Sequence, residues 1–418
     1  MVSIKELRQK YFGALDATDE DMQIVSAVRE YVDKEIMPRR QDLDGGWHRD
    51  ETLARETFAT VHKGLVDIGV QRGVYPEELG GLGISPVANE MIVEEISRAD
   101  AGLATHLGII SWVMRPAMSA GRMDLLQQYV PKICDDSPHT CYMALTEPSG
   151  GANSEDPTQH GRTLQTVAEL DGDEWVINGH KIWPSGGGLA DIAYCTLCTT
   201  DPAKGDEGVA LIYVPPGAEG MTFSKPFQKM GMCWTDTNTE VFFDNVRVPK
   251  ENRVAGPGKD AEILHDIVAT GRLATCSFAL GAAQACFEIA LNWTKDREIA
   301  GKKVRSRSLH AGILGEMAMK IESARAYKMH INRMLRSGKY GRPGSRLMLS
   351  KCSAAKVHTC DMTIWVVNKA MELMGSYGYA FDYNVEKYYR DVKILQLWIG
   401  GSQRAILDAA LGYYAFEW

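Results

Sequence analysis

The spacing of hydrophobic residues divides the chain into three parts. From about residue 16 to about 135, apolar residues recur every three or four positions, which predicts amphipathic helices. Two such stripes are formed by Ile24, Val25, Val28 and Val32, and by Val61, Leu65, Ile68 and Val70. From about 140 to about 255 the period changes to two, which is typical of half-buried strands. From about 260 onward the helical period returns, and residues 261–298 form one long stretch without proline.

The middle part has the turn signals of a small sheet. Residues 166–183 alternate in polarity and predict a hairpin with Asp171-Gly172 at its tight turn. Residues 192–198, 208–214 and 239–248 predict further short strands. The order helix, sheet, helix predicts an α+β chain with an N-terminal helical domain over 1–138, a middle β-domain over 139–256 and a C-terminal helical domain over 257–418.

Composition narrows the classes of function. The chain has 418 residues, 45% of them hydrophobic, and a net charge of -8, which argues against a nucleic-acid partner. We find no apolar run of the roughly 20 residues that a membrane helix needs, and the N-terminus is charged from its start, so we expect a cytoplasmic protein without a membrane partner. Nine cysteines, an odd number in apolar surroundings, indicate reduced thiols. Cys195 and Cys198 lie in a predicted strand without a second ligand pair, so we predict core packing there and no metal site.

Five ordered blocks carry a family resemblance. L-T-E-P-S-G-G stands at 145–151, and N-G-H-K-I-W-P-S-G-G at 178–187. K-M-G, T-D-T and F-D-N-V-R-V-P fall within 229–249, and D-R-E-I-A-G occupies 296–301. The last block runs from G-S-Y-G-Y to G-G-S-Q-R over 375–404. Together they resemble the acyl-CoA dehydrogenases, which implies that the C-terminal domain is a four-helix bundle. It also implies an FAD-dependent oxidoreductase acting on an acyl-CoA, a homodimer or homotetramer, and electron-transfer flavoprotein as the acceptor.

The resemblance also implies two sets of binding residues. The cofactor set is Met143, Leu145, Thr146, Trp183, Ser185, Arg297, Glu372, Gly375, Ser376, Gly401 and Gln403. In this family the tryptophan covers the flavin ring, the hydroxyl two positions later reaches its N5 edge, and the arginine binds the FAD pyrophosphate of a neighbouring subunit. The substrate set is Ala104, Ser154, Arg272, Trp398 and Gly400.

The usual catalytic base is missing. In most of the family a glutamate before the first glycine of the G-G-S-Q turn removes the α-proton, and here that residue is Ile399, which cannot accept a proton. Some relatives place the glutamate before an arginine on the long helix, and that position is Gly271. The phenylalanine near the flavin is Ala300 here, so we expect room for a cyclic or aromatic acyl group. This double absence argues against ordinary fatty-acid β-oxidation.

Three hypotheses remain open from the sequence. The chain is a dehydrogenase of an unusual acyl-CoA with a relocated base, for which Asp100 is the first candidate and His106 the second. Alternatively, it catalyses an elimination that needs no base, such as release of sulfinate from a short acyl-CoA, with Arg115 binding an anionic substituent. In the third, it binds flavin and acyl-CoA without turnover and acts through partners.

Overall fold

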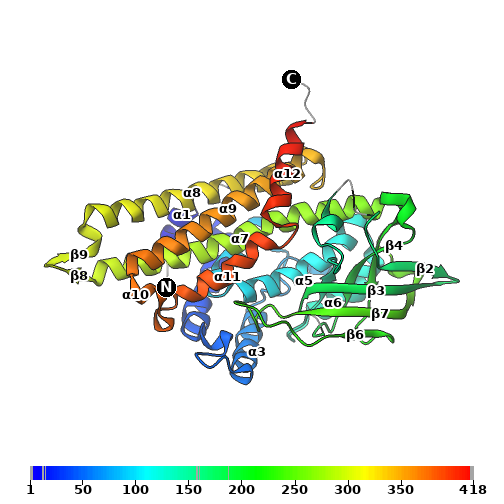
Figure 1. Ribbon diagram of the computed structural model, residues 1–418, viewed down its shortest axis with the longest axis horizontal. Helices are drawn as coiled ribbons and strands as arrows, with labels where there is room; N and C mark the ends of the chain where they lie inside the picture. The colour runs from blue at the N-terminus through cyan, green and yellow to red at the C-terminus, as the bar shows by residue number, and fades with distance from the viewer. Residues whose placement is uncertain are drawn as a thin grey trace.

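The computed structural model describes residues 3–11, 14, 16–156, 159, 161–186 and 188–414. It confirms the predicted order of a helical part, a small sheet and a helical bundle. In Figure 1 the sheet lies at one end of the long axis, and a small hairpin projects from the bundle at the other end. The N-terminal helices lie along one side of the bundle, between these two ends.

The N-terminal part contains six helices. They are α1 (Ile4–Lys10), α2 (Asp19–Tyr31), α3 (Glu51–Asp67), α4 (Pro86–Ala99), α5 (Ala101–Ala120) and α6 (Met123–Ile133). Polar caps begin several of them: Thr18 forms a capping box with Asp21 at α2, and Asp50 accepts from the amide of Leu53 at α3. Because α3 ends at Asp67, the predicted stripe that continued to Ile68 and Val70 is wrong for these two residues.

The middle part is a seven-stranded sheet. Its strands are β1 (Tyr142–Ala144), β2 (Val167–Asp171), β3 (Glu174–Ser185), β4 (Tyr194–Thr199), β5 (Val209–Val214), β6 (Met221–Phe223) and β7 (Asn238–Pro249). They lie in the order β1-β4-β2-β3-β7-β6, with β5 paired to β4. Asp171 pairs with Glu174, so the turn residues of the β2–β3 hairpin are Gly172 and Asp173, one position later than predicted.

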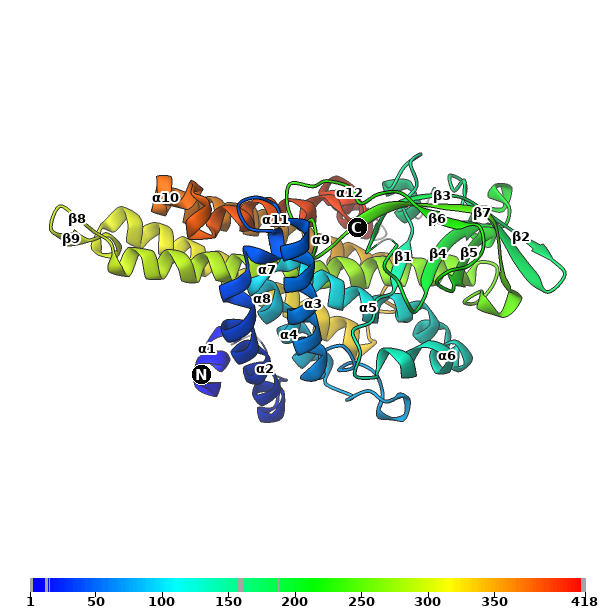
Figure 2. The same cartoon turned by 90° about the horizontal axis from the view of Figure 1, so that it is seen from below.

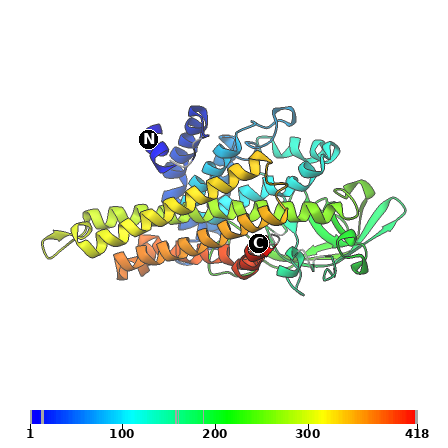
Figure 3. The ribbon, with the colours of Figure 1, turned by 90° about the horizontal axis from the view of Figure 1, so that it is seen from above.

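The bundle is built around α7 (Lys259–Asp296), the long helix predicted from residues 261–298. Beside it lie α8 (Ser308–Ser337), α9 (Arg346–Met374), α11 (Val385–Leu397) and α12 (Gly401–Tyr414), with the short α10 (Ser376–Tyr379) after α9. Figure 3 shows α7, α8 and α9 side by side. The hairpin of β8 (Glu298–Ile299) and β9 (Lys302–Lys303) follows α7.

Close packing and burial mark α7 as the core of the molecule. A β-carbon on Gly281 would lie 2.3 Å from the carbonyl oxygen of Glu94 in α4, so only glycine allows the two helices to approach this closely. By length and composition α7 could also cross a membrane, but 72% of its apolar window is buried inside the chain. This burial is the environment of a central bundle helix.

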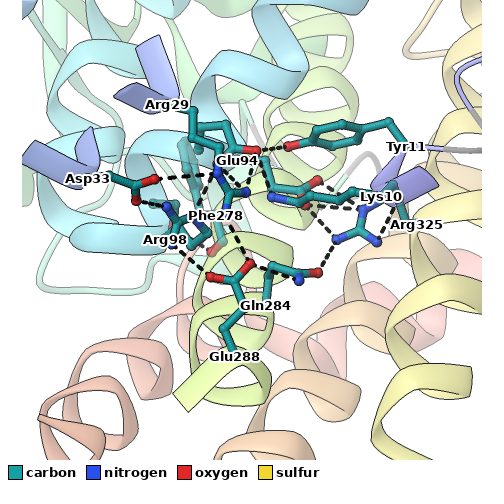
Figure 4. Close-up of polar contacts among 12 residues, drawn as sticks. Lys10, Tyr11, Arg29, Asp33, Glu94, Arg98, Phe278, Gln284, Glu288 and Arg325 are labelled. Carbon is teal, nitrogen blue, oxygen red and sulfur yellow. Dashed lines mark hydrogen bonds and ion pairs between the residues drawn. The ribbon is translucent and has the colours of Figure 1, made fainter. Parts of the chain in front are cut away.

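A buried ionic network joins the N-terminal helices to the bundle (Figure 4). Arg325 of α8 donates to Glu94 of α4 at 2.7 Å, and Arg98 of α4 donates to Glu288 of α7 at 2.8 Å. Four cations and four carboxylates alternate in it: Lys10, Arg29, Arg98 and Arg325 with Asp33, Glu94, Glu95 and Glu288. Because the charges balance, they can be buried together.

Candidate active site

A large cavity lies where the three parts of the chain meet. It has a volume of about 1130 Å³. The sheet contributes residues of β1, β3 and β7. The helices α4, α5, α7, α8 and α11, with the turn into α12, contribute most of the remaining wall. Several of the predicted binding residues line it: Met143, Leu145, Thr146, Trp183, Ser185, Trp398, Gly400, Gly401 and Gln403.

An irregularity in β3 places Trp183 in this wall. The β3–β7 register shifts between Ile182 and Ser185, so one extra residue stands in β3. Trp183 takes a φ of 69° there and is 47% exposed, while its carbonyl accepts from the side chain of Asn238 at 3.0 Å. The bulge also accommodates Pro184, because a proline is tolerated in a strand where the ladder is already interrupted. Gly187, the last residue of that sequence block, lies outside the described residues.

The wall on the sheet side fits a flavin ring. It combines an exposed indole with apolar Met143 and Leu145, which suit the face of a flat aromatic ring. Asp236 also lines the cavity, and its Oδ1 is buried without a hydrogen-bond partner among the described residues. A buried carboxylate oxygen in this state needs a donor, and the ring N–H at the edge of an isoalloxazine can supply one.

The turn between α11 and α12 is held by two buried cations. Arg272 of α7 donates from Nε to the carbonyl of Ile399 at 3.2 Å, and Lys356 of α9 donates to the carbonyl of Trp398. Ile399, Gly400 and Gly401 all have positive φ, of 49°, 78° and 66°. A β-branched residue in this conformation is strained, and such strain persists only where surrounding contacts enforce it.

Neither of the two usual base positions offers a proton acceptor. Ile399 lines the cavity with an aliphatic side chain. A β-carbon on Gly271 would lie 3.1 Å from Cδ1 of Ile399 and 3.1 Å from Cζ2 of Trp112. The space beside Gly271 is therefore occupied by the side chains of Ile399 and Trp112, and a glutamate at position 271 would have to displace them.

Asp100 and His106 lie outside the cavity wall. Asp100 caps α5 by accepting from the amide of Leu103 at 2.9 Å, and it pairs with buried Lys387 at 2.6 Å. These contacts hold its pKa below the usual range despite burial, which favours a structural role over the predicted catalytic one. His106 is buried against the rings of Phe58 and His62, and burial lowers its pKa. This geometry does not support either residue as a base toward a substrate in the cavity.

Three predicted substrate residues are likewise turned away from the cavity. Ala104 is fully buried in the core, while its neighbour Thr105 lines the wall. Ser154 donates its hydroxyl to the carbonyl of Gly151 at 2.7 Å. Arg272 is fully buried, and its contacts to the turn make it a support of the wall.

A second group of predicted cofactor residues lies far from the cavity. Arg297 follows α7 next to the β8–β9 hairpin, and its guanidinium stacks 5.5 Å from the ring of Tyr377 in α10. Gly375 and Ser376 stand at the start of α10, and Glu372 lies on the last turn of α9, where it pairs with Lys369. Figures 2 and 3 place this end of the bundle opposite the sheet. One copy of the chain does not bring the two groups together.

Ala300 belongs to that distant end as well. It sits in the turn of the β8–β9 hairpin, is exposed and has a φ of 47°. Figure 1 places this hairpin at the end of the bundle opposite the sheet, and Ala300 is not part of the cavity wall. Its small side chain therefore does not enlarge the acyl pocket within a single copy.

Glu155 is the site residue that sequence reasoning missed. It ends a short 3-10 turn, Ala152–Glu155, that follows the first sequence block, and it lines the cavity with only 5% exposure. Its Oε2 lies 2.7 Å from the place that a β-carbon on Gly400 would take. Burial raises the pKa of Glu155 to about 7, although Arg272 and Lys356 oppose this shift. The only signal in the sequence is the acidic pair Glu155-Asp156 directly after a flavin-type loop.

Known proteins resemble the chain over nearly its whole length. Residues 18–137, 142–246 and 262–411 match the N-terminal, middle and C-terminal domains of acyl-CoA dehydrogenases. The chain is 30% identical to cyclohex-1-ene-1-carbonyl-CoA dehydrogenase of Syntrophus aciditrophicus, over 93% of this chain and 88% of that enzyme.

Two solved structures have the same fold. Butyryl-CoA dehydrogenase from Megasphaera elsdenii superposes with a TM-score of 0.82 at 26% identity, covering 96% of this chain and 99% of that one. A chain from the structure of the electron transferring flavoprotein of Acidaminococcus fermentans gives a TM-score of 0.82 at 28% identity, covering 95% and 98%. The protein therefore belongs to the acyl-CoA dehydrogenase family, the FAD-dependent oxidoreductases that act on the CH–CH bond of acyl-CoA thioesters.

Proposed function

We propose that the protein dehydrogenates a cyclic or aromatic acyl-CoA and uses a base at a new position. The observation that carries this proposal is the apolar turn at the usual base position. Ile399 and Trp398 line the cavity there, together with Trp112 and Phe278, and Gly271 has no room for a longer side chain. Aromatic and aliphatic walls suit a ring, which is wider than a straight chain. The relative from Syntrophus aciditrophicus, which is named for a cyclic acyl-CoA, supports this substrate class.

The residues of this chain orient the reactants and exclude water. FAD, when bound, accepts the hydride from the β-carbon. Trp183, Met143 and Leu145 would cover its ring, and Thr146 and Ser185 offer hydroxyls at its edge. Trp398 is fixed by a hydrogen bond from its Nε1 to Thr275 at 3.0 Å, so it forms a rigid wall for the acyl group. A dry, preformed pocket favours a proton transfer that water would otherwise compete with.

A second copy of the chain would complete the FAD site. Arg297, Gly375 and Ser376 belong to the region of α10 and the β8–β9 hairpin, which lies at the end of the bundle opposite the sheet. A neighbouring subunit would therefore have to supply them to an FAD whose flavin ring lies against Trp183. This supports a homo-oligomer, either a dimer or a tetramer. Electron-transfer flavoprotein is the acceptor that fits the family, and the structural likeness to the Acidaminococcus fermentans chain supports it.

Anaerobic titration of the flavin tests the substrate class. The FAD-loaded protein is mixed with cyclohexanecarbonyl-CoA, cyclohex-1-ene-1-carbonyl-CoA, 3-phenylpropionyl-CoA and butyryl-CoA, and bleaching of the flavin is followed. We expect bleaching with at least one ring-containing thioester and little with butyryl-CoA. Faster bleaching by butyryl-CoA than by every ring-containing probe would contradict the proposal.

Arg115 favours elimination as the second candidate function. Its guanidinium lines the cavity, and no ion pair to a carboxylate is present for it among the described residues. Burial lowers its pKa, so an anionic substrate group would be a favourable partner. Adding 3-sulfinopropionyl-CoA to the same titration separates the two functions. In base-independent desulfination the carbon–sulfur bond breaks, a proton replaces sulfur on the carbon, and the released SO₂ is hydrated, so propionyl-CoA and sulfite form with an unchanged flavin spectrum.

A further inference from the structure

From the geometry of the cavity we infer that Glu155 is the relocated catalytic base. This inference rests on the proposed dehydrogenation. Glu155 belongs to the sheet part of the chain, whereas both usual base positions belong to the bundle. Its carboxylate nevertheless reaches the turn that holds Ile399, since a β-carbon on Gly400 would be 2.7 Å from its Oε2. A carboxylate thus stands beside the vacated position, although it comes from a segment more than two hundred residues earlier in the chain.

The carboxylate is buried but not committed to another partner. Glu155 is 5% exposed and lines the cavity, and its Oε2 has no hydrogen-bond partner among the described residues. Its neighbouring cation Arg272 lies 3.7 Å away, an ion-pair distance without a hydrogen bond. A buried polar atom in this state is costly unless a ligand or a function explains it.

A purely structural role as the counter-ion of Arg272 explains Glu155 poorly. Arg272 already donates to Asp408 and to the hydroxyl of Ser353, the latter at 2.7 Å, and its Nε binds the carbonyl of Ile399. Asp408, which also pairs with Arg404, supplies the hydrogen-bonded carboxylate of this arginine, whereas Glu155 lies 3.7 Å from Nη2 of Arg272 without a hydrogen bond. The space between the Glu155 carboxylate and the Arg272 guanidinium is open because residue 400 is a glycine. A β-carbon on Gly400 would lie 2.7 Å from Oε2 of Glu155 and 2.8 Å from Nη2 of Arg272.

The charged groups around Glu155 tune its proton affinity. Arg272 of α7, Lys356 of α9 and Arg404 of α12 favour the carboxylate, while burial and Asp408 of α12 favour the acid. The balance leaves the pKa at about 7, and a general base works best when its pKa lies near the working pH. A more exposed carboxylate would be a weaker base.

The proposed step is balanced with FAD as the oxidant. A carboxylate oxygen of Glu155 takes the proton from the α-carbon of the acyl group, and the electrons of that C–H bond form the new carbon–carbon double bond. The hydride from the neighbouring carbon leaves to the family's FAD, which is reduced. The thioester is otherwise unchanged, and Glu155 returns its proton to solvent after the product leaves.

Solvent deuterium exchange tests the base without depending on complete turnover. The FAD-loaded wild type and Glu155→Gln are incubated without oxygen in D₂O with cyclohexanecarbonyl-CoA, 3-phenylpropionyl-CoA and butyryl-CoA, the thioesters of the panel whose α-carbon carries hydrogen. Mass spectrometry measures deuterium at the α-carbon. We expect exchange and flavin bleaching to fall by about 10²- to 10⁴-fold in Glu155→Gln, the usual contribution of a general base. Calorimetric binding of the same thioester should change by less than about tenfold, because Gln keeps the size of Glu. Asp156→Asn, which changes the adjacent carboxylate, is the control and should keep exchange.

A second variant keeps the inference falsifiable if Glu155→Gln is inactive for a reason other than loss of the base. In Glu155→Gln/Ile399→Glu a carboxylate is restored at the usual position, and we expect bleaching to appear with butyryl-CoA, which bleaches the wild type little. Its appearance in a variant that carries Glu155→Gln shows that this change removed a base and left the fold and the FAD site intact. Full exchange in Glu155→Gln, with any probe that the wild type exchanges, would overturn the role of Glu155.

The same panel separates failure of the inference from failure of the proposed function. If the wild type exchanges and bleaches only with butyryl-CoA, the substrate class is wrong, and the loss in Glu155→Gln with that probe still supports the base. If the wild type releases sulfite without exchange, both dehydrogenation and a base at Glu155 are overturned.

Discussion

At the scale of single residues, two side chains at the turn before α12 carry the proposed mechanism. Ile399 removes the carboxylate from the turn before α12, and Glu155 brings one to the same turn from the 3-10 turn at 152–155. Glu94, Asp100 and Asp408 are buried as well, but each accepts a hydrogen bond from a cation, whereas Glu155 lies 3.7 Å from Arg272 without a hydrogen bond. Because burial disfavours the charged form of Glu155, the stability of the protein should depend on pH.

Glu155 should make the stability of the protein depend on pH. Its pKa is about 7 in the folded chain against an ordinary value near 4.5, so the folded state binds this proton more tightly between these values. Stability is therefore highest below this window and falls as pH rises through about 7. Replacing Glu155 by Gln removes the effect, so the variant should gain up to about 3 kcal/mol relative to wild type between about pH 5 and about pH 8. Thermal unfolding of both proteins at fixed FAD concentration measures it, and parallel pH profiles would contradict the raised pKa.

At the scale of elements, the turn from Trp398 to Gly401 is the part of the site that depends most on its neighbours. Two cations from α7 and α9 bind its carbonyls, and its three consecutive residues with positive φ lie between α11 and α12. The sequence motif identifies this turn, but contacts with the surrounding helices set its conformation. Comparing Gly400 with Gly401 separates the cost of backbone strain from the cost of crowding by neighbouring side chains.

Gly400 and Gly401 differ only in what surrounds them. Both have positive φ, so alanine at either position should cost about 1–2 kcal/mol in backbone strain. A β-carbon on Gly400 would also meet Arg272 Nη2 at 2.8 Å, whereas one on Gly401 meets only a carbonyl at 3.7 Å. We expect Gly400→Ala to lower the unfolding temperature more than Gly401→Ala, by the equivalent of about 1–3 kcal/mol, and to slow flavin bleaching. Equal effects of the two changes would mean that Glu155 and Arg272 are not in contact with the turn.

At the scale of the whole molecule, a network of buried ion pairs connects the N-terminal helices to the C-terminal bundle. The network of Figure 4 links α1, α2 and α4 to α7 and α8. Removing one partner from such a network leaves a buried charge, which costs more than removing both. The Glu94–Arg325 pair provides the test.

Arg325→Met should destabilise the protein strongly, by about 3–5 kcal/mol, because Lys10, at 3.6 Å, would be the one cation left to Glu94 among the described residues. The double change Glu94→Gln/Arg325→Met removes both charges and should recover a large part of this loss. Differential scanning calorimetry of wild type, both single variants and the double variant measures the coupling. A double variant that is as unstable as the sum of the single variants would show that the pair does not couple.

The sequence was enough to predict the helix–sheet–helix fold and the family, and both predictions are confirmed. Apolar residues repeat every 3.6 positions in a helix and every two positions in a strand, because one face of each element is buried. Turns and tight loops require particular residues such as glycine and proline. Both patterns are local, so the sequence alone reveals them. Trp183, Thr146 and Gln403 were found in this way because their blocks are contiguous. The tertiary structure decided which residues share a cavity. Asp100 left the candidate site because Lys387, far along the chain, pairs with it, and Glu155 entered because α7 and α12 bring the Gly400 turn to its carboxylate. Such contacts, and the burial that sets a pKa, arise only between segments distant in sequence, and no local pattern contains them.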